Sequence, residues 1–211
     1  MLGQLSKWFG GHGRSAQNTT THLHGVTVVV HNTRPDIDTT RVLARLDAAL
    51  GLIERHSPHH FRHLRRDFSK ILVQRYACRG AYSTEDHTCL VELTFTVNPD
   101  FNEAQIAATI LHEAMHARLH RLGFPLDMPD RARQERFCRR AEIEFGQSVP
   151  GGSPVVERAL AALQAADADV APAIDPALAA RRVAAVDIQA LAAPVWLKRI
   201  LAERAGLDLD E

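Results

Sequence analysis

The segment HEAMH at residues 112–116 constrains this chain more than any other stretch of its sequence. It lies within residues 102–123, whose composition and apolar spacing predict one long helix that stops at Gly123. On such a helix His112 and His116 share one face, about 6 Å apart along the axis, and can hold one metal ion between them. The flanking residues are apolar, so the helix suits a core interior in which unpaired polar groups would be costly. The segment therefore predicts a buried helix that carries a metal site.

The same segment carries the carboxylate that a hydrolytic metal centre requires, Glu113. Zinc lowers the pKa of a bound water to roughly 7, and a neighbouring carboxylate can take the proton and deliver it to a leaving amine. We therefore predict a Zn2+ cofactor, with Glu113 as the catalytic general base. The competing interpretation is a structural histidine pair beside an ordinary surface glutamate.

A third zinc ligand is expected from the next helix, which Asp130 can cap and which ends at Gly146. Its carboxylates Glu135 and Glu142 are seven residues apart and share a face, with Cys138 between them. We take Glu135 as the third ligand. Glu142 is the alternative ligand, or a partner that orients one of the imidazoles.

His120 continues the histidine row at four-residue spacing, but helix geometry argues against it as a ligand. A zinc ion midway between His112 and His116 lies roughly 9 Å along the axis from residue 120. An imidazole and a metal bond together reach only about 6.5 Å. We therefore place His120 outside the ligand set, at the substrate cleft.

Residue patterns around the motif predict an α+β fold. Strands are expected at residues 25–32, from residue 71, and at 89–97, where apolar side chains alternate with mostly polar ones. Helices are expected from a cap at Asp36 or Asp38 to about Arg55, over 59–68, and through 131–146. We expect a small antiparallel or mixed sheet packed on the motif helix and on the helix that carries Glu135.

The chain divides at two changes of composition. Residues 1–21 include a stretch with almost no apolar side chain and are predicted to be a flexible lead-in, with structure starting near His22. Residues 22–150 form the predicted catalytic domain. The Ala-rich residues 151–211 are predicted to be a helical C-terminal region, with three short segments separated near Pro172 and Pro194. This region could cover the cleft, mediate dimerisation or recruit a partner.

Composition limits the partners and the compartment. Lys plus Arg and Asp plus Glu are equal at 25 each, so no global field draws the chain to nucleic acid or to an anionic membrane. The His- and Arg-rich stretch at 56–66 is interpreted as a solvated helix face. Three cysteines without CxxC spacing fit a reducing cytoplasm, and no segment has the apolar length of a signal peptide or a membrane span. We expect a soluble cytoplasmic protein whose partner is a protein or peptide substrate.

The order of these features resembles the gluzincin class of zinc metallopeptidases, in which an HExxH helix is followed by a helix that donates a glutamate ligand. Over about residues 25–150 the arrangement is similar to the compact minigluzincins, which include the ImmA/IrrE-like bacterial peptidases. The resemblance implies His112, His116 and Glu135 as ligands and Glu113 as the general base. That group commonly reads E-x-x-A in the second helix, whereas Cys138 stands at the alanine position here.

The resemblance also implies where a substrate would lie. The strand at 89–97 would form the edge of the active-site cleft and pair with an extended peptide, a general mode of recognition. The mechanism needs a group that stabilises the oxyanion of the tetrahedral intermediate. Tyr76, Tyr82, His120 or an arginine could supply it, and the sequence does not choose among them.

Two other functions remain as alternatives. A deformylase-like hydrolase also uses HExxH and would take its third ligand from Cys78 or Cys89, although the segment YACRGAY lacks the Gly-rich context of that cysteine in deformylases. A catalytically silent zincin-like interaction module would keep the fold without turnover. The intact Glu113 argues against the silent module, because a structural metal site does not require it.

Overall fold

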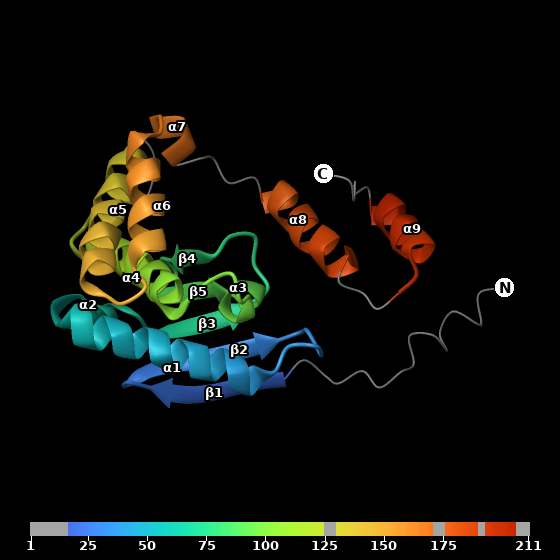
Figure 1. Ribbon diagram of the computed structural model, residues 1–211, viewed down its shortest axis with the longest axis horizontal. Coiled ribbons are helices and arrows are strands. Elements are labelled where there is room, and N and C mark those ends of the chain that lie inside the picture. The colour runs from blue at the N-terminus through green and yellow to red at the C-terminus, as the bar shows by residue number, and fades with distance from the viewer. Residues whose placement is uncertain (1–16, 125–129, 171–175, 190–192, 206–211) are drawn as a thin grey trace.

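Five strands form one mixed sheet against which the helix of the HEAMH segment packs (Figure 1). The computed structural model describes residues 17–124, 130–170, 176–189 and 193–205. The strands are β1 (Gln17–Leu23), β2 (Val26–Asn32), β3 (Lys70–Gln74), β4 (Gly80–Ser83) and β5 (Thr88–Glu92). Their order is β1-β2-β3-β5-β4, with β2, β3 and β5 parallel and each outer strand antiparallel to its neighbour. The predicted α+β fold with a mixed sheet is confirmed.

Strands β1 and β2 form a hairpin through a two-residue turn. His24 and Gly25 both have positive φ, 51° and 76°, the turn geometry that matches the twist of paired strands. Strand β1 starts at Gln17 rather than near His22, because β-branched threonines at 19–21 pair with the opposite strand. Residues 1–16 of the predicted lead-in lie outside the described residues.

The predicted strand at 89–97 is wrong in its second half. Strand β5 ends at Glu92, and Leu93–Val97 forms the short helix α3. The Glu92 side chain causes the change, since it accepts a hydrogen bond from the Phe95 backbone N–H at 2.7 Å and caps the helical turn. Strand β5 also lies between β3 and β4, so the edge of the sheet is β4.

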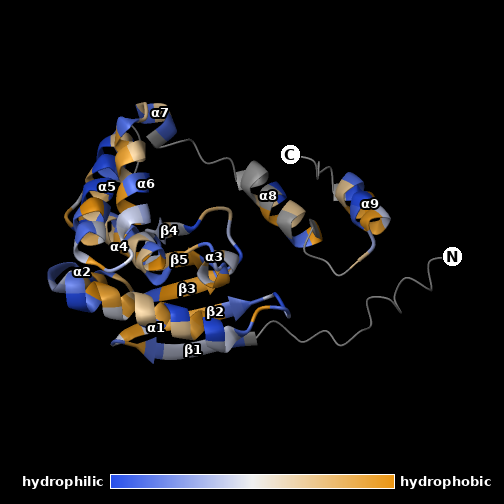
Figure 2. Ribbon diagram, in the orientation of Figure 1, coloured by the Kyte–Doolittle hydropathy of each residue, from blue (hydrophilic) through white to orange (hydrophobic). Residues whose placement is uncertain are grey.

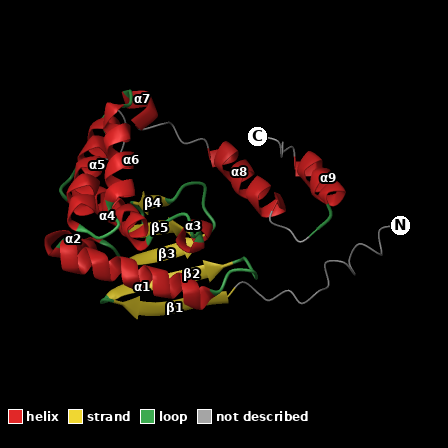
Figure 3. Ribbon diagram, viewed as in Figure 1, coloured by secondary structure: helices red, strands yellow, loops and turns green. Residues whose placement is uncertain are grey.

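Helices cover the sheet and continue into the C-terminal region. They are α1 (Thr39–His56), α2 (Pro58–Asp67), α3, α4 (Glu103–Arg121), α5 (Arg131–Ser148), α6 (Ser153–Gln164), α7 (Asp167–Val170), α8 (Pro176–Gln189) and α9 (Val195–Ala205). Asp38 caps α1 as predicted, whereas Asp130 precedes α5 without making a side-chain capping bond. The predicted helical C-terminal region is confirmed, and Figure 3 shows α8 and α9 standing apart from the helices gathered on the sheet.

Helix α4 is buried on nearly every side. It packs against α1, α2, α5 and strand β4, and a reciprocal capping box between Asn102 and Gln105 fixes its start. Its small residues let neighbours approach closely, and alanines occupy buried positions 104, 107, 108, 114 and 117. Figure 2 shows hydrophobic residues along β3 and on parts of α1. The HEAMH segment is therefore held in the core, as its apolar flanks predict.

Candidate metal centre

Helices α4 and α5 bring two imidazoles and one carboxylate together. The Nε2 atoms of His112 and His116 are 3.1 Å apart. The two carboxylate oxygens of Glu135 lie 3.1 Å from the Nε2 of His112 and 3.3 Å from the Nε2 of His116. All three side chains are buried, at 9% exposure or less for each residue. The two Nε2 atoms and the carboxylate of Glu135 thus converge on one point.

These separations fit a small divalent ion. Tetrahedral zinc with bonds of about 2.0–2.1 Å holds its ligand atoms about 3.3 Å apart. The three separations, 3.1, 3.1 and 3.3 Å, lie close to that spacing. The two Nε2 atoms face each other, so at most one of them can donate a proton to the other. Two imidazoles and one carboxylate are a donor set that suits a metal ion such as zinc.

Cys138 borders the same cluster from helix α5. The ligand atoms of His112, His116 and Cys138 all lie within 4.8 Å of one another, and these buried residues could hold a metal ion. The Glu135 oxygens lie 3.1 Å and 3.3 Å from the ring nitrogens. For the thiol sulfur of Cys138 the corresponding limit is 4.8 Å. Burial, with the negative charge of Glu135 next in effect, raises the pKa of the Cys138 thiol well above its usual value. The sequence prediction did not count Cys138 as a ligand, although its position one turn after Glu135 was visible.

Glu142 lies behind His112 and not beside the converging nitrogens. Its Oε1 is 2.8 Å from the Nδ1 of His112 and 2.8 Å from Arg139, and its Oε2 is 3.3 Å from Arg158. Burial acts to raise the pKa of Glu142, but the hydrogen bond from His112 and the two guanidinium charges lower it to about 2. An ionised Glu142 fixes the Nδ1–H tautomer and leaves Nε2 free to bind. Of the two roles considered for Glu142, the geometry corresponds to orienting an imidazole.

Glu113 lies on the same buried helix, beneath the edge strand. It is 6% exposed, and burial raises the pKa of its carboxyl group. A Cβ at Gly80 would lie 3.0 Å from the Oε1 of Glu113 and 2.6 Å from the Thr109 Cγ2. Glycine at position 80 therefore allows strand β4 to rest directly against Glu113. Strand β5, the first part of the predicted cleft edge at 89–97, lies inside the sheet, and among the described strands β4 is the sheet edge next to it.

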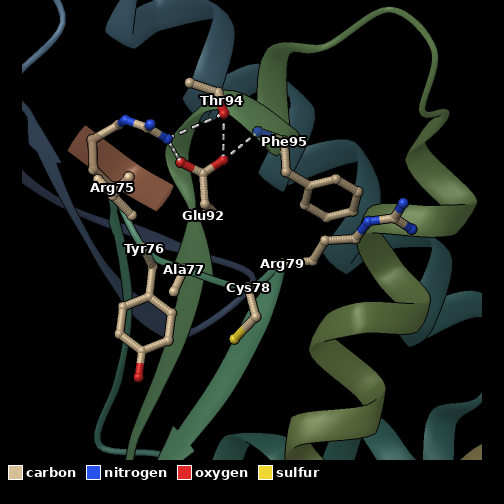
Figure 4. Close-up of a pocket in the computed structure, with 9 residues that line it drawn as sticks. Arg75, Tyr76, Ala77, Cys78, Arg79, Glu92, Thr94 and Phe95 are labelled. Atoms are coloured by element: carbon tan, nitrogen blue, oxygen red, sulfur yellow. Dashed lines mark hydrogen bonds and ion pairs between the residues drawn. The ribbon is translucent and has the colours of Figure 1, made fainter. Parts of the chain in front are cut away.

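A cavity opens beside this strand, at the loop that joins β3 to β4 (Figure 4). Its volume is about 240 Å³, and it is lined by Arg75, Tyr76, Ala77, Cys78, Arg79, Glu92, Thr94, Phe95 and Val183. Cys78 donates to the Gly80 carbonyl at 3.0 Å, and burial, with the charge of Glu113 next in effect, raises the pKa of its thiol to about 11. Because Gly80 rests against Glu113, the cavity lies at the end of β4 that meets this carboxylate.

The candidates for oxyanion stabilisation occupy two places. Tyr76 lines the cavity, and burial, Cys78 and Glu113 all raise the pKa of its phenol. Tyr82 instead lies between His87 and His120, with its hydroxyl 2.7 Å and 3.2 Å from their Nδ1 atoms. His120 thus pairs with a tyrosine one turn beyond the cluster and does not join it, consistent with its predicted exclusion from the ligands.

The other histidines and cysteines of the prediction lie away from the cluster. On α2, His59, Arg62, Arg65 and Arg66 are exposed, as expected of a solvated face, while His60 is buried. Cys89 is buried within β5, and the exposed Cys78 donates to the carbonyl of Gly80 at 3.0 Å. Within the described residues, the cysteine grouped with the two histidines is Cys138, and that group does not include Cys78 or Cys89, the ligands considered for the deformylase-like alternative.

Comparisons with protein-family models, with curated protein sequences and with solved structures find nothing that matches this chain. Among the described residues, no helix combines the length and the apolar character needed to cross a membrane. The chemistry of the candidate metal centre is therefore the basis for a function.

Proposed function

We propose that this chain is a zinc-dependent metallopeptidase. The observation that carries the proposal is the convergence of His112, His116 and Glu135 at separations of 3.1–3.3 Å, close to those of a tetrahedral zinc site. These three residues would hold the ion. Glu113 follows His112 on the same helix and would act as the general base.

The chain's own residues account for the proton transfers of peptide hydrolysis. A zinc ion held by these residues would supply Lewis acidity, which polarises a carbonyl and acidifies water. Glu113 takes a proton from the water while the oxygen of that water attacks the carbonyl carbon. The same carboxyl then gives the proton to the amide nitrogen as the carbon–nitrogen bond breaks. Burial supports this exchange, because it raises the pKa of Glu113 and helps the group to hold a proton between the two steps.

The edge strand supplies a binding surface for an extended substrate. Among the described strands, β4 pairs with β5 alone, and its other edge would pair with the backbone of an extended peptide. Gly80 keeps this strand in contact with Glu113. Tyr76 is the oxyanion candidate that Glu113 affects electrostatically. A peptide along β4 would pass the proposed base and the metal ligands.

The proximity of Cys138 favours a second candidate function. A thiolate that joined the two histidines and Glu135 would complete four protein ligands, which is typical of a structural zinc site. The chain would then be a catalytically silent interaction module. Under this alternative Glu113 has no role, which makes its replacement decisive.

Glu113→Gln should keep the zinc and lose hydrolysis. We expect about one zinc per chain by elemental analysis and a fall in peptide turnover of at least about 100-fold, the contribution typical of a general base. Glu144→Gln, which changes an exposed glutamate on α5, is the matched control and should keep both properties. Turnover by Glu113→Gln at the wild-type rate, or absence of metal after a metal-replete preparation, would overturn the proposal.

A further inference from the structure

Arg79 precedes Gly80 in the chain and sits at the entrance to strand β4. Its guanidinium lies over the ring of Phe101 at 4.3 Å and near the ring of Phe95 at 5.5 Å. Figure 4 shows the side chain beside Phe95 and directed away from Tyr76. Within the described part of the chain, the guanidinium makes no hydrogen bond and no ion pair with an acidic group. The aromatic rings hold the cation in place without neutralising it.

The surroundings of Arg79 carry an excess of positive charge. Arg139 and Arg158 both contact a single buried carboxylate, Glu142, at 2.8 Å and 3.3 Å. Burial lowers the pKa of Arg79, and the positive charges of Arg158 and Arg139 lower it further, whereas Glu142 raises it. Arg139 and Arg158 thus share one carboxylate, which is itself hydrogen-bonded to His112 and acts on Arg79 only through its charge. The three guanidinium groups therefore outnumber the one carboxylate among them.

The second observation is the position of Arg79 relative to the proposed chemistry. Strand β4 begins at Gly80 beside Glu113 and proceeds to Tyr82, whose hydroxyl is 3.2 Å from His120 further along α4. A peptide that pairs antiparallel with β4 runs from Tyr82 towards Arg79, so its C-terminal side lies next to Arg79. The opposite direction would bring an N-terminal ammonium towards three guanidinium groups, a repulsive arrangement. Charge therefore selects the antiparallel direction.

We infer that Arg79 binds a substrate carboxylate one or two residues beyond the scissile bond. The residue spacing of about 3.4 Å along a strand sets this short distance. The favoured substrates are peptides whose free C-terminus lies at this position, and the inference rests on the proposed function. An arginine suits the role because its planar fork can donate two parallel hydrogen bonds to one carboxylate.

The test compares peptides with and without that carboxylate. The probes are three mixtures of N-terminally blocked hexapeptides. The first set ends in a free carboxylate, and the second ends in an amide. The third set also ends in an amide and has aspartate at its last two positions. Cleavage is followed by mass spectrometry. We expect the wild-type protein to cleave the free-carboxylate peptides on the order of tenfold to a hundredfold more efficiently than the plain amides, the effect of charge-assisted hydrogen bonds.

The variants assign the preference to Arg79. Arg79→Gln should bring the ratio of free-carboxylate to amide peptides close to one, and Arg79→Lys should retain part of it. Arg140→Gln, which removes the same charge from an exposed position on α5, should leave the ratio unchanged. Equal cleavage of all three peptide sets by the wild-type protein would overturn the inference. Preference for the aspartate amides over the free termini would overturn the C-terminal assignment and identify a side-chain carboxylate instead.

Binding separates this inference from the proposed function. Calorimetric titration of Glu113→Gln with the free-carboxylate and amide peptides measures the same discrimination without turnover. Discrimination in binding with no hydrolysis by the zinc-loaded wild type would remove the peptidase proposal and keep the carboxylate site. Hydrolysis without discrimination in either assay would overturn the inferred carboxylate site and leave the peptidase proposal intact.

Discussion

At the scale of single residues, His112 is the junction between two carboxylates on α5. Its Nδ1 is 2.8 Å from Glu142, and its Nε2 is 3.1 Å from Glu135. The ring can serve both only if one nitrogen donates and the other faces an ion or carries a second proton. Glu142 therefore orients the His112 ring. Glu135 faces the same point as the Nε2 atom through which the ring would bind a metal ion.

This division of labour predicts the ranking of three variants in zinc affinity. Glu135→Ala should weaken zinc binding most, because both imidazoles face its oxygens. Glu142→Ala should weaken it about 10- to 100-fold, as loss of a partner behind a ligating histidine does. Cys138→Ala should have the smallest effect. Competition with a chromophoric chelator measures all three affinities, and thermal melts show whether each variant is folded.

The contradicting result is equally specific. If Cys138→Ala lost more affinity than Glu135→Ala, the thiol would be a primary ligand. The cobalt-substituted wild-type protein would then also show a near-ultraviolet thiolate-to-metal band that Cys138→Ala lacks. Such a band would favour the silent module over the peptidase, since it would indicate a closed site.

Residues within one helix could be placed from the sequence, and residues between helices could not. The periodicity of α4 fixes His112, Glu113 and His116 relative to one another. The approach of Glu135 and Cys138 depends on how α5 packs on α4, which no spacing encodes. Periodicity alone put Glu135 and Glu142 on one face, but only the packing shows that they meet opposite nitrogens of His112.

At the scale of elements, the sheet shows where a local pattern misleads. Alternating apolar residues continue through 93–97, yet Glu92 caps a turn and the strand ends there. The edge strand β4 went unpredicted because its four residues, GAYS, are too short and too weakly apolar for a periodicity to show. Strand β2 and helix α1 were predicted well, since each has a long pattern and a turn or cap residue at its boundary.

Helix α2 carries a pH-dependent element of stability. His60 is buried with its Nδ1 unpaired among the described residues, and burial, with the charges of His59 and His63, lowers its pKa from 6.5 to about 4. Between these two pKa values the unfolded chain binds a proton at His60 that the folded chain does not. Stability is therefore lost as pH falls from about 6.5 towards 4.

His60→Leu should reduce that loss. From pH 7.5 to pH 5 the wild-type protein should lose about 2 kcal/mol more unfolding free energy than the variant. Urea unfolding at the two pH values gives the comparison. His22→Leu, a change at an exposed histidine on β1, should keep the wild-type dependence. An identical pH dependence in His60→Leu and wild type would show that His60 titrates normally in the folded state.

At the scale of the whole molecule, the C-terminal region meets the domain at the cavity. Val183 of α8 lines it, and Asp187 lies 2.9 Å from Arg75 and 3.4 Å from Arg34. Arg75 also bonds to Glu92, the residue that caps α3, so one arginine joins the sheet to α8. The Ala-rich sequence predicted helices here, but no pattern marked Asp187 as a point of attachment.

Asp187→Asn should loosen α8 without unfolding the domain. Asp187 is 39% exposed, and such ion pairs contribute about 0–1 kcal/mol each. We expect faster hydrogen–deuterium exchange over residues 176–189, with little change in the strands. Salt should act likewise on the wild-type protein, because these charges are partly screened at high ionic strength. Asp169→Asn on α7, also exposed, should leave the exchange of α8 unchanged. If α8 exchanged equally in Asp187→Asn and wild type, then its attachment would depend on apolar contacts such as that of Val183, and salt would have no effect on it.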